Sequence, residues 1–350
     1  MRWDSVLRLW AALSVVVVAV SGCVVAAVFA AGSGTPHLAA SCGSGSAGSA
    51  QRRCDSFEFD GHKRSYRLYV PAKVASPAPL LVVLHGGTQS SASMEVQTGK
   101  GFNRKADDTG ALVVYPDSVG IHWNDGREKA LNLFDERHVD DVGFLRALVA
   151  SLRQQYPIDP QRVFVTGFSN GGMMTLRLAC ESTDVYRGFV AVAASLPEEI
   201  SQNCHPATAR PVELIDGTAD RFVPYEGGGV GLLGGAGRVI GAEATFGEFR
   251  TILGCSGVES APWPQGTPPK DSKVTQHRAT GCQDDVQVML FEIKGGLHVW
   301  PGVGDDKPTG LLASGRQVQG LDATEEVWRF LGLAAGGHEA QVSQTSEATQ

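Results

Sequence analysis

The chain has 350 residues, of which 43% are hydrophobic, 19% are charged and 43 are glycine. This composition excludes a disordered chain, a coiled coil and a membrane protein with many spans. Lysine and arginine total 30 against 37 aspartate and glutamate, a formal net charge of -7. Because nucleic-acid binding depends on a basic surface, this balance argues against a nucleic-acid partner.

The first 31 residues are predicted to be an export segment. Arg8 precedes a stretch without charge that runs from residue 9 to residue 31, and a basic start followed by an apolar run is typical of such segments. Three outcomes stay open: lipidation of Cys23, cleavage at the small residues 28–30, or retention of the stretch as one membrane anchor. Each outcome places the rest of the chain outside the cytoplasm, secreted or at the cell surface, with membrane contact through this segment alone.

The remaining chain divides into a linker, one domain and a tail. Glycine, serine and alanine make up 14 of the 19 residues from 32 to 50, so residues 32–53 are predicted to be a flexible linker. Residues 54–335 are expected to form one domain, and residues 336–350 a disordered tail. The chain is expected to be a monomer.

Six cysteines follow the export segment, at positions 42, 54, 180, 204, 255 and 282. None forms a Cys-x-x-Cys or Cys/His spacing that would indicate zinc, so no metal or cofactor is expected. Outside the cytoplasm, three disulfides are the natural prediction. The sequence leaves 15 pairings open, and the near-neighbour set 42–54, 180–204 and 255–282 is one of them.

Strand and helix patterns alternate through the predicted domain. Strands are expected at 64–70, 80–84, 112–115, 163–166, 189–193, 212–215 and 286–293, and helices at 142–155, 171–180, 242–253 and 323–333. Continuous apolar runs such as 80–84 are typical of strands that are buried on both faces. The alternation therefore predicts an α/β fold with a mostly parallel central sheet and helices on both faces. Ligands of such folds bind beyond the carboxyl ends of the strands.

The strand at 163–166 leads into Gly167-Phe168-Ser169-Asn170-Gly171 and then a helix. A Gly-x-Ser-x-Gly motif between strand and helix is the setting of a nucleophile elbow. We therefore predict Ser169 as a nucleophile, the alternative being a glycine-rich turn that the serine merely caps.

A serine nucleophile needs a histidine base and an acid that orients it. Of the four histidines after Ser169, only His298 follows a buried strand pattern, so we predict it as the base. Asp220 is the preferred acid and Asp216 the alternative, because both follow the strand at 212–215.

The backbone N–H groups of Asn170 and Thr88 are predicted to stabilise the oxyanion, since both lie in loops after buried strands. Trp123 and Asp141 are predicted to line the substrate pocket, helix capping being the alternative for Asp141. Residues 227–241 hold 8 glycines among 15, which indicates either a gating flap or a disordered insertion.

Several motifs follow one another in a recognisable order. They are Arg67-Leu68-Tyr69-Val70-Pro71, Leu84-His85-Gly86-Gly87-Thr88-Gln89-Ser90, Tyr115-Pro116-Asp117, Trp123-Asn124-Asp125-Gly126-Arg127, Val139-Asp140-Asp141-Val142-Gly143-Phe144, Gly167-Phe168-Ser169-Asn170-Gly171-Gly172-Met173, Gly217-Thr218-Ala219-Asp220 and Trp300-Pro301-Gly302. In these motifs the chain resembles the extracellular esterases grouped with polyhydroxybutyrate depolymerases and feruloyl or acetylxylan esterases, including actinobacterial lipoprotein esterases.

The resemblance implies an α/β-hydrolase fold, a triad of Ser169, Asp220 and His298, and a substrate pocket that includes Trp300. Two positions depart from the family pattern: Leu297 replaces a glycine, and Asp216 stands where histidine is common. The expected function is a secreted or membrane-tethered serine esterase acting on polysaccharide- or polyester-linked esters. A serine peptidase or acyl transferase, and an inert carbohydrate- or lipid-binding module, are the alternatives.

Overall fold

A computed structural model describes residues 48–127, 139–263, 273–303 and 320–333. The predicted export segment, Cys23, Cys42 and the tail lie outside the described residues. The linker boundary is corrected, because a strand begins at Gln51, inside the range predicted as linker, and its Arg53 pairs with Leu68 of the next strand. Within the described parts, no helix has the length and apolar character needed to cross a membrane.

The core of the described structure is one ten-stranded sheet. In spatial order its strands are β1 (Gln51–Phe59), β2 (His62–Val70), β4 (Leu112–Pro116), β3 (Ala78–Leu84), β5 (Ile158–Phe168), β6 (Phe189–Val192), β7 (Val212–Gly217), β12 (Val288–Ile293), β11 (Val274–Thr280) and β10 (Gly257–Pro262). The six strands from β4 to β12 run parallel, and the strands at both edges pair antiparallel. The predicted mostly parallel sheet is confirmed.

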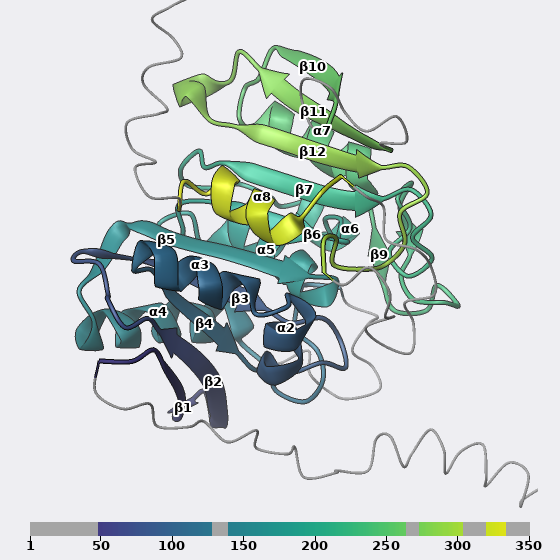
Figure 1. Ribbon diagram of the computed structural model, residues 1–350. Coiled ribbons are helices and arrows are strands. Elements are labelled where there is room, and N and C mark those ends of the chain that lie inside the picture. Colours follow the sequence, from purple (N-terminus) through teal and green to yellow (C-terminus); the bar gives the residue numbers. More distant parts are fainter. Residues whose placement is uncertain (1–47, 128–138, 264–272, 304–319, 334–350) are drawn as a thin grey trace, which may run out of the picture. The chain divides into compact units, whose positions relative to one another are not determined.

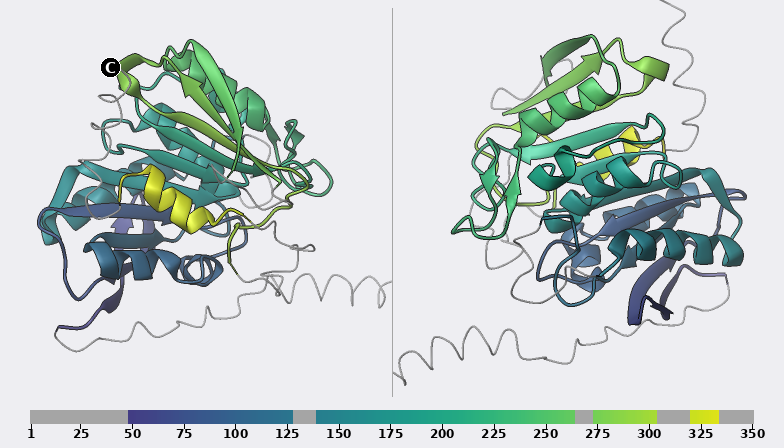
Figure 2. Two further views of the ribbon diagram at one scale, coloured as in Figure 1. Left: turned by 45° about the horizontal axis from the view of Figure 1, so that its top comes forward. Right: turned by 180° about the vertical axis from the view of Figure 1, so that it is seen from behind.

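Helices cover both faces of this sheet (Figures 1 and 2). They are α2 (Ser91–Gln97), α3 (Gly101–Thr109), α4 (Asp141–Gln155), α5 (Asn170–Glu181), α6 (Glu198–Ser201), α7 (Ala242–Ile252) and α8 (Ala323–Phe330). Successive side chains of β3 alternate between two hydrophobic cores, as the pleat of a strand requires. Leu80 and Val82 belong to the core formed with α4, α5 and α7, whereas Leu81 and Val83 belong to the core formed with α2, α3 and α8.

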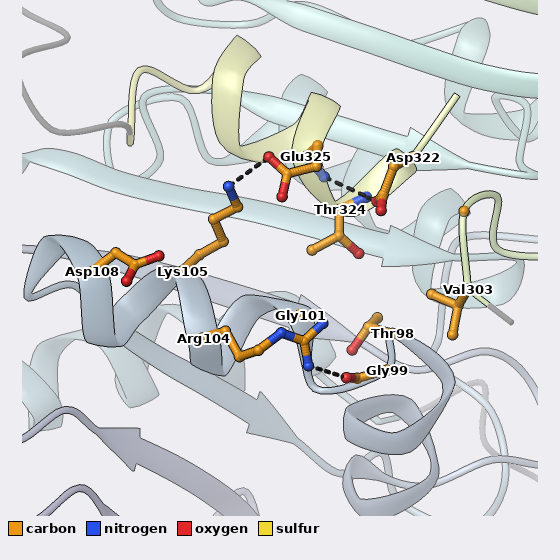
Figure 3. A pocket seen from close by; sticks show the side chains of 11 residues that line it. Thr98, Gly99, Gly101, Arg104, Lys105, Asp108, Val303, Asp322, Thr324 and Glu325 are labelled. Carbon is orange, nitrogen blue, oxygen red and sulfur yellow. Dashed lines mark hydrogen bonds and ion pairs between the residues drawn. The ribbon is translucent and has the colours of Figure 1, made fainter. Parts of the chain in front are cut away.

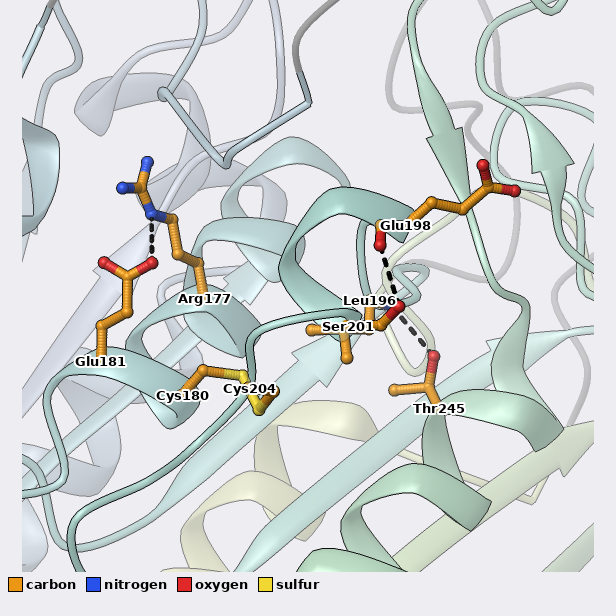
Figure 4. The surroundings of a disulfide bond; sticks show 8 residues. All are labelled: Arg177, Cys180, Glu181, Leu196, Glu198, Ser201, Cys204 and Thr245. Atoms are coloured by element: carbon orange, nitrogen blue, oxygen red, sulfur yellow. Dashed lines mark hydrogen bonds and ion pairs between the residues drawn. A yellow bond between two sulfur atoms is a disulfide. The ribbon is translucent and has the colours of Figure 1, made fainter.

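Two disulfides join described residues, Cys180–Cys204 and Cys255–Cys282, and both belong to the near-neighbour set. Cys54 is also disulfide-bonded. The first bridge ties the carboxyl end of α5 to the segment that follows α6 (Figure 4). Because α5 begins at the residue after Ser169, this bridge fixes the far end of the helix on which the predicted nucleophile depends.

Candidate active site

Ser169 occupies a sharp turn between β5 and α5. Its φ of 55° lies in the left-handed region, which residues with a side chain rarely adopt. The turn requires glycine on both sides. A Cβ atom on Gly167 would lie 2.3 Å from the carbonyl oxygen of Gly171, and one on Gly171 would lie 2.4 Å from that of His85. This strained backbone is the geometry of a nucleophile elbow.

The structure brings Ser169, His298 and Asp220 together from three loops. The Nε2 atom of His298 lies 2.9 Å from the Oγ atom of Ser169, and its Nδ1 atom lies 2.7 Å from Oδ2 of Asp220. The other carboxylate oxygen of Asp220 accepts hydrogen bonds from the backbone N–H groups of Phe222 and Val223. The histidine ring contacts the rings of Phe168 and Phe222, with centroids 4.9 and 5.3 Å away. These contacts hold the imidazole in one orientation.

Asp216, the alternative acid, lies elsewhere. It is buried at the end of β7, where its Oδ1 atom accepts a hydrogen bond from the backbone N–H of Ala194. Burial, and then the negative charge of Asp220, raise the pKa of Asp216 well above its ordinary value. The geometry therefore favours Asp220 as the partner of His298.

The prediction for the oxyanion site needs one correction. The N–H of Thr88 donates to the carbonyl oxygen of Ile121 at 2.7 Å, so this group is already used. The N–H of Gly86 donates to the side chain of Gln89. Among the described residues, the N–H of Gly87 has no such partner. A Cβ atom on Gly87 would lie 3.8 Å from Cβ of Asn170, so the two residues adjoin. Gly87 therefore replaces Thr88 as the candidate donor beside Asn170.

Trp123 was predicted to line the pocket, and this is wrong because the side chain is fully buried. Its indole N–H donates to the carbonyl oxygen of His85, and its backbone N–H donates to Oδ1 of Asn170. The side chain of Asn170 in turn donates to the carbonyl oxygen of Trp123. Trp123 thus positions the residue that follows the nucleophile instead of contacting substrate.

Asp141 and Trp300 are corrected for the same reason, since each is 1% exposed. Asp141 lies 2.5 Å from Nη2 of Arg64 and accepts the backbone N–H of Asn124. The indole N–H of Trp300 donates to Oγ1 of Thr324. Its ring contacts Phe168, whose ring in turn contacts that of His298. Both side chains support the site from inside the protein.

The sequence analysis did not predict the chain of buried polar contacts that begins at the side chain of Asn170. The side chain of Asn170 donates to Oδ2 of Asp125 at 2.6 Å. Asp125 is fully buried and forms an ion pair with the buried Arg127, whose Nη1 donates to the carbonyl oxygen of Ala236. The motif Trp123–Arg127 pointed to this region, but no pattern in the sequence indicates a contact with residue 236.

A polar cavity of about 350 Å³ lies between α3 and the start of α8 (Figure 3). Lys105 and Glu325 form an ion pair across it, and Arg104 donates to the carbonyl oxygen of Gly99. Its wall includes Thr324, which accepts the hydrogen bond of Trp300. None of the three triad residues lines this cavity, so it is separate from the catalytic arrangement.

Comparison with known proteins identifies the family of the chain. A family model described as Phospholipase/Carboxylesterase matches residues 135–229, a range that contains Ser169 and Asp220. The chain is 30% identical over 275 residues to "Putative esterase NocK" of Nocardia uniformis subsp. tsuyamanensis, a match that covers 75% of this chain and 78% of that protein. It is also 30% identical over 228 residues to feruloyl esterase B of Piromyces equi, covering 63% of this chain and 39% of that protein.

A solved acetyl xylan esterase from Aspergillus awamori matches with a TM-score of 0.55 at 16% identity, over 82% of this chain and 100% of that one. At this identity the likeness shows the fold alone, which is the predicted α/β-hydrolase fold. Because the match to the Nocardia protein extends over most of both chains, the chain belongs to the esterase family of α/β-hydrolases.

Proposed function

We propose that this esterase hydrolyses carboxylic esters through a covalent acyl-enzyme on Ser169. The observation that supports the proposal is the unbroken row of contacts from Ser169 Oγ to His298 Nε2, at 2.9 Å, and from His298 Nδ1 to Asp220 Oδ2, at 2.7 Å. A serine hydroxyl is a weak nucleophile by itself, and a histidine in contact with it supplies the missing base.

The reaction follows from this row. His298 takes the proton of Ser169 as the serine oxygen attacks the ester carbonyl, and Asp220 stabilises the charged imidazole. The N–H groups of Gly87 and Asn170 stabilise the negative oxygen of the tetrahedral intermediate. The bond to the alcohol then breaks, and the alcohol leaves with the proton from His298. In the second half, His298 takes a proton from water, the resulting hydroxide attacks the acyl-enzyme, and the acid is released as Ser169 regains its proton.

We further propose esters that are linked to polysaccharides or hydroxyalkanoates as the substrate class. Sequence relatives named feruloyl esterase and acetylxylan esterase support polysaccharide-linked acyl groups, and one named poly(3-hydroxybutyrate) depolymerase supports hydroxyalkanoate esters. The disulfides support action outside the cytoplasm, in an oxidising compartment. Residues 1–31 then serve as the export segment, and an intact mass of protein extracted from membranes tests whether Cys23 is lipidated.

The test is Ser169→Ala, assayed with p-nitrophenyl acetate. We expect hydrolysis to fall by about three orders of magnitude or more, while circular dichroism and the urea midpoint stay unchanged. An organophosphonate that labels the wild-type protein should fail to label this variant. Retained turnover in Ser169→Ala would remove the serine from the mechanism.

The chain offers a matched control in a second serine. The Oγ atom of Ser260 lies 2.8 Å from Nδ1 of His277, and Nε2 of His277 lies 3.3 Å from Oε2 of Glu292. These three residues lie on the neighbouring strands β10, β11 and β12, and Ser260 lacks the left-handed backbone of Ser169. Ser260→Ala should therefore keep full activity. Loss of activity in this variant would show that Ser169 had been wrongly assigned as the nucleophile.

A further inference from the structure

The glycine-rich segment 227–241 forms an ordered hairpin with two exposed leucines at its tip. Its short strands are β8 (Gly228–Gly229) and β9 (Arg238–Val239). Leu232 is 65% exposed and Leu233 is 100% exposed. The other large hydrophobic side chains exposed in the described residues, Val96 and Val258, are isolated valines. Two adjacent leucines in water are less ordinary than single exposed apolar residues.

The hairpin is built so that its base is fixed and its tip projects. Val239 is fully buried at the base. The N–H of Gly234 donates to the carbonyl oxygen of Gly231, which closes a four-residue turn with Leu232 and Leu233 at its centre. Glycine, asparagine, aspartate and serine usually occupy such exposed turns. Neither leucine has the left-handed backbone, so the turn itself gives no reason for leucine.

One side of the hairpin is connected through Phe222 to Asp220 and His298, the acid and the base of the triad. The N–H of Gly231 donates to the carbonyl oxygen of Phe222 at 2.7 Å. The ring of Phe222 packs on His298, and its N–H donates to Asp220. Gly231, the residue at which the turn begins, is therefore one hydrogen bond away from a residue that contacts two of the three triad members, Asp220 and His298.

The other side is attached to the candidate oxyanion site. Arg127 donates to the carbonyl oxygen of Ala236 at 2.5 Å, and the ion pair of Arg127 with Asp125 continues to the side chain of Asn170. A Cβ atom on Gly237 would lie 2.8 Å from Cβ of Arg127, so the hairpin backbone packs directly on this arginine. Both attachments place the hairpin at the rim of the catalytic site. In Figure 1 its strand β9 lies at the end of the sheet where the arrowheads of β5 and β7 lie.

We propose that the Leu232–Leu233 tip docks on the apolar surface of an aggregated, water-insoluble ester and so holds the catalytic site against that surface. The proposal rests on the proposed esterase function. Burial of both side chains in an apolar phase is favourable in proportion to the area removed from water. Because the tip lies at the rim of the catalytic site, docking would bring ester groups of the surface close to Ser169.

Charge and area favour this occupant over two others. Residues 226–241 contain one acid, Glu226, and one base, Arg238, which is paired with Glu198, so the hairpin has no basic excess to attract an anionic membrane. A second copy of the chain is disfavoured because two leucine side chains cover far less than the roughly 800 Å² per partner that a stable interface needs.

The test compares one ester in two physical states. Tributyrin is dissolved below its solubility limit and forms droplets above it. The variant Leu232→Ser/Leu233→Ser should hydrolyse dissolved tributyrin at the wild-type rate, whereas its adsorption to droplets and its rate on them should fall by about tenfold or more. Val258→Ser removes an exposed apolar side chain from the edge strand β10 and should leave both states unaffected.

Each other outcome overturns the proposal. Equal adsorption of the wild-type protein and the double variant to droplets would show that the tip does not dock. Binding of the wild-type protein to phosphatidylcholine vesicles as strong as to droplets would identify a lipid surface instead. A dimer in light scattering that the double variant loses would identify a second copy. Failure of the wild-type protein on dissolved tributyrin and p-nitrophenyl acetate alike would instead refute the esterase function.

Discussion

Glu213 gives a quantitative prediction about stability. It is fully buried in β7, and burial together with the nearby Glu326 raises its pKa well above the ordinary 4.5. Arg329 hydrogen-bonds Glu326 at 2.8 Å rather than Glu213. The carboxyl group of Glu213 is therefore held protonated in the folded protein at pH values where the unfolded chain has lost that proton.

The sign and the size follow from proton linkage. Between the unfolded and the folded pKa the folded protein binds one proton more, so the free energy of unfolding falls as pH rises, by about 1.4 kcal/mol per pH unit. Glutamine has nearly the same shape and does not titrate. The advantage of Glu213→Gln over the wild-type protein should therefore grow as pH rises above about 4.5, by at most about 1.4 kcal/mol per pH unit.

Urea unfolding at three pH values, with the disulfides intact, measures this difference. Glu58→Gln, at an exposed position of β1, is the matched control and should show no comparable growth. If the difference between Glu213→Gln and the wild-type protein stayed constant across this pH range, the buried proton on Glu213 would be refuted.

Three further variants test the site. Gly87→Ala would bring a Cβ atom 2.7 Å from Cδ2 of His122, so the displaced N–H should lower kcat on p-nitrophenyl acetate by about 10²- to 10³-fold with KM little changed; an unchanged kcat would exclude Gly87 as the oxyanion donor. Asp216→Asn should keep kcat/KM within about threefold, whereas Asp220→Asn should lose about 10⁴-fold, as in other serine triads; the reverse ranking would make Asp216 the acid. Asp125→Asn breaks a buried ion pair with Arg127 and should destabilise the fold by about 3–5 kcal/mol, measured as a lower urea midpoint; an unchanged midpoint would contradict this pairing.

The sequence predicted the centre of the sheet better than its edges. The strands β3 and β6 are buried along their whole length, and each appears in the sequence as a continuous apolar run, as expected of a strand that is covered on both faces. The edge strand β10 has a half-exposed and exposed pattern and includes Pro262. Such a segment has no continuous apolar run from which a strand could be predicted, and it forms a strand by pairing with β11. The helices α2 and α3 were missed as well.

The same division holds within the site. Ser169 and His298 could be predicted because each follows a buried strand and the chain order of the triad is fixed by the fold. Thr88 was wrong because its N–H pairs with Ile121, 33 residues further along, and no local pattern records that contact. The aromatic side chain of Trp123 led to the prediction of a pocket wall. Its complete burial depends on how several loops pack, which the sequence does not indicate.

Three carboxyl groups within residues 213–220 show why the identity of the acid required the structure. Asp220 accepts two backbone N–H groups and contacts His298, which together fix the position of its carboxylate. Asp216 accepts one N–H group in a buried position. Among the described residues, Glu213 accepts no N–H group at all. The sequence places all three acids in or just after one strand, whereas the number of N–H groups aimed at each depends on how the following loops fold. The fold of those loops also decides which carboxyl group reaches the histidine, and here it brings Asp220 to 2.7 Å from Nδ1 of His298.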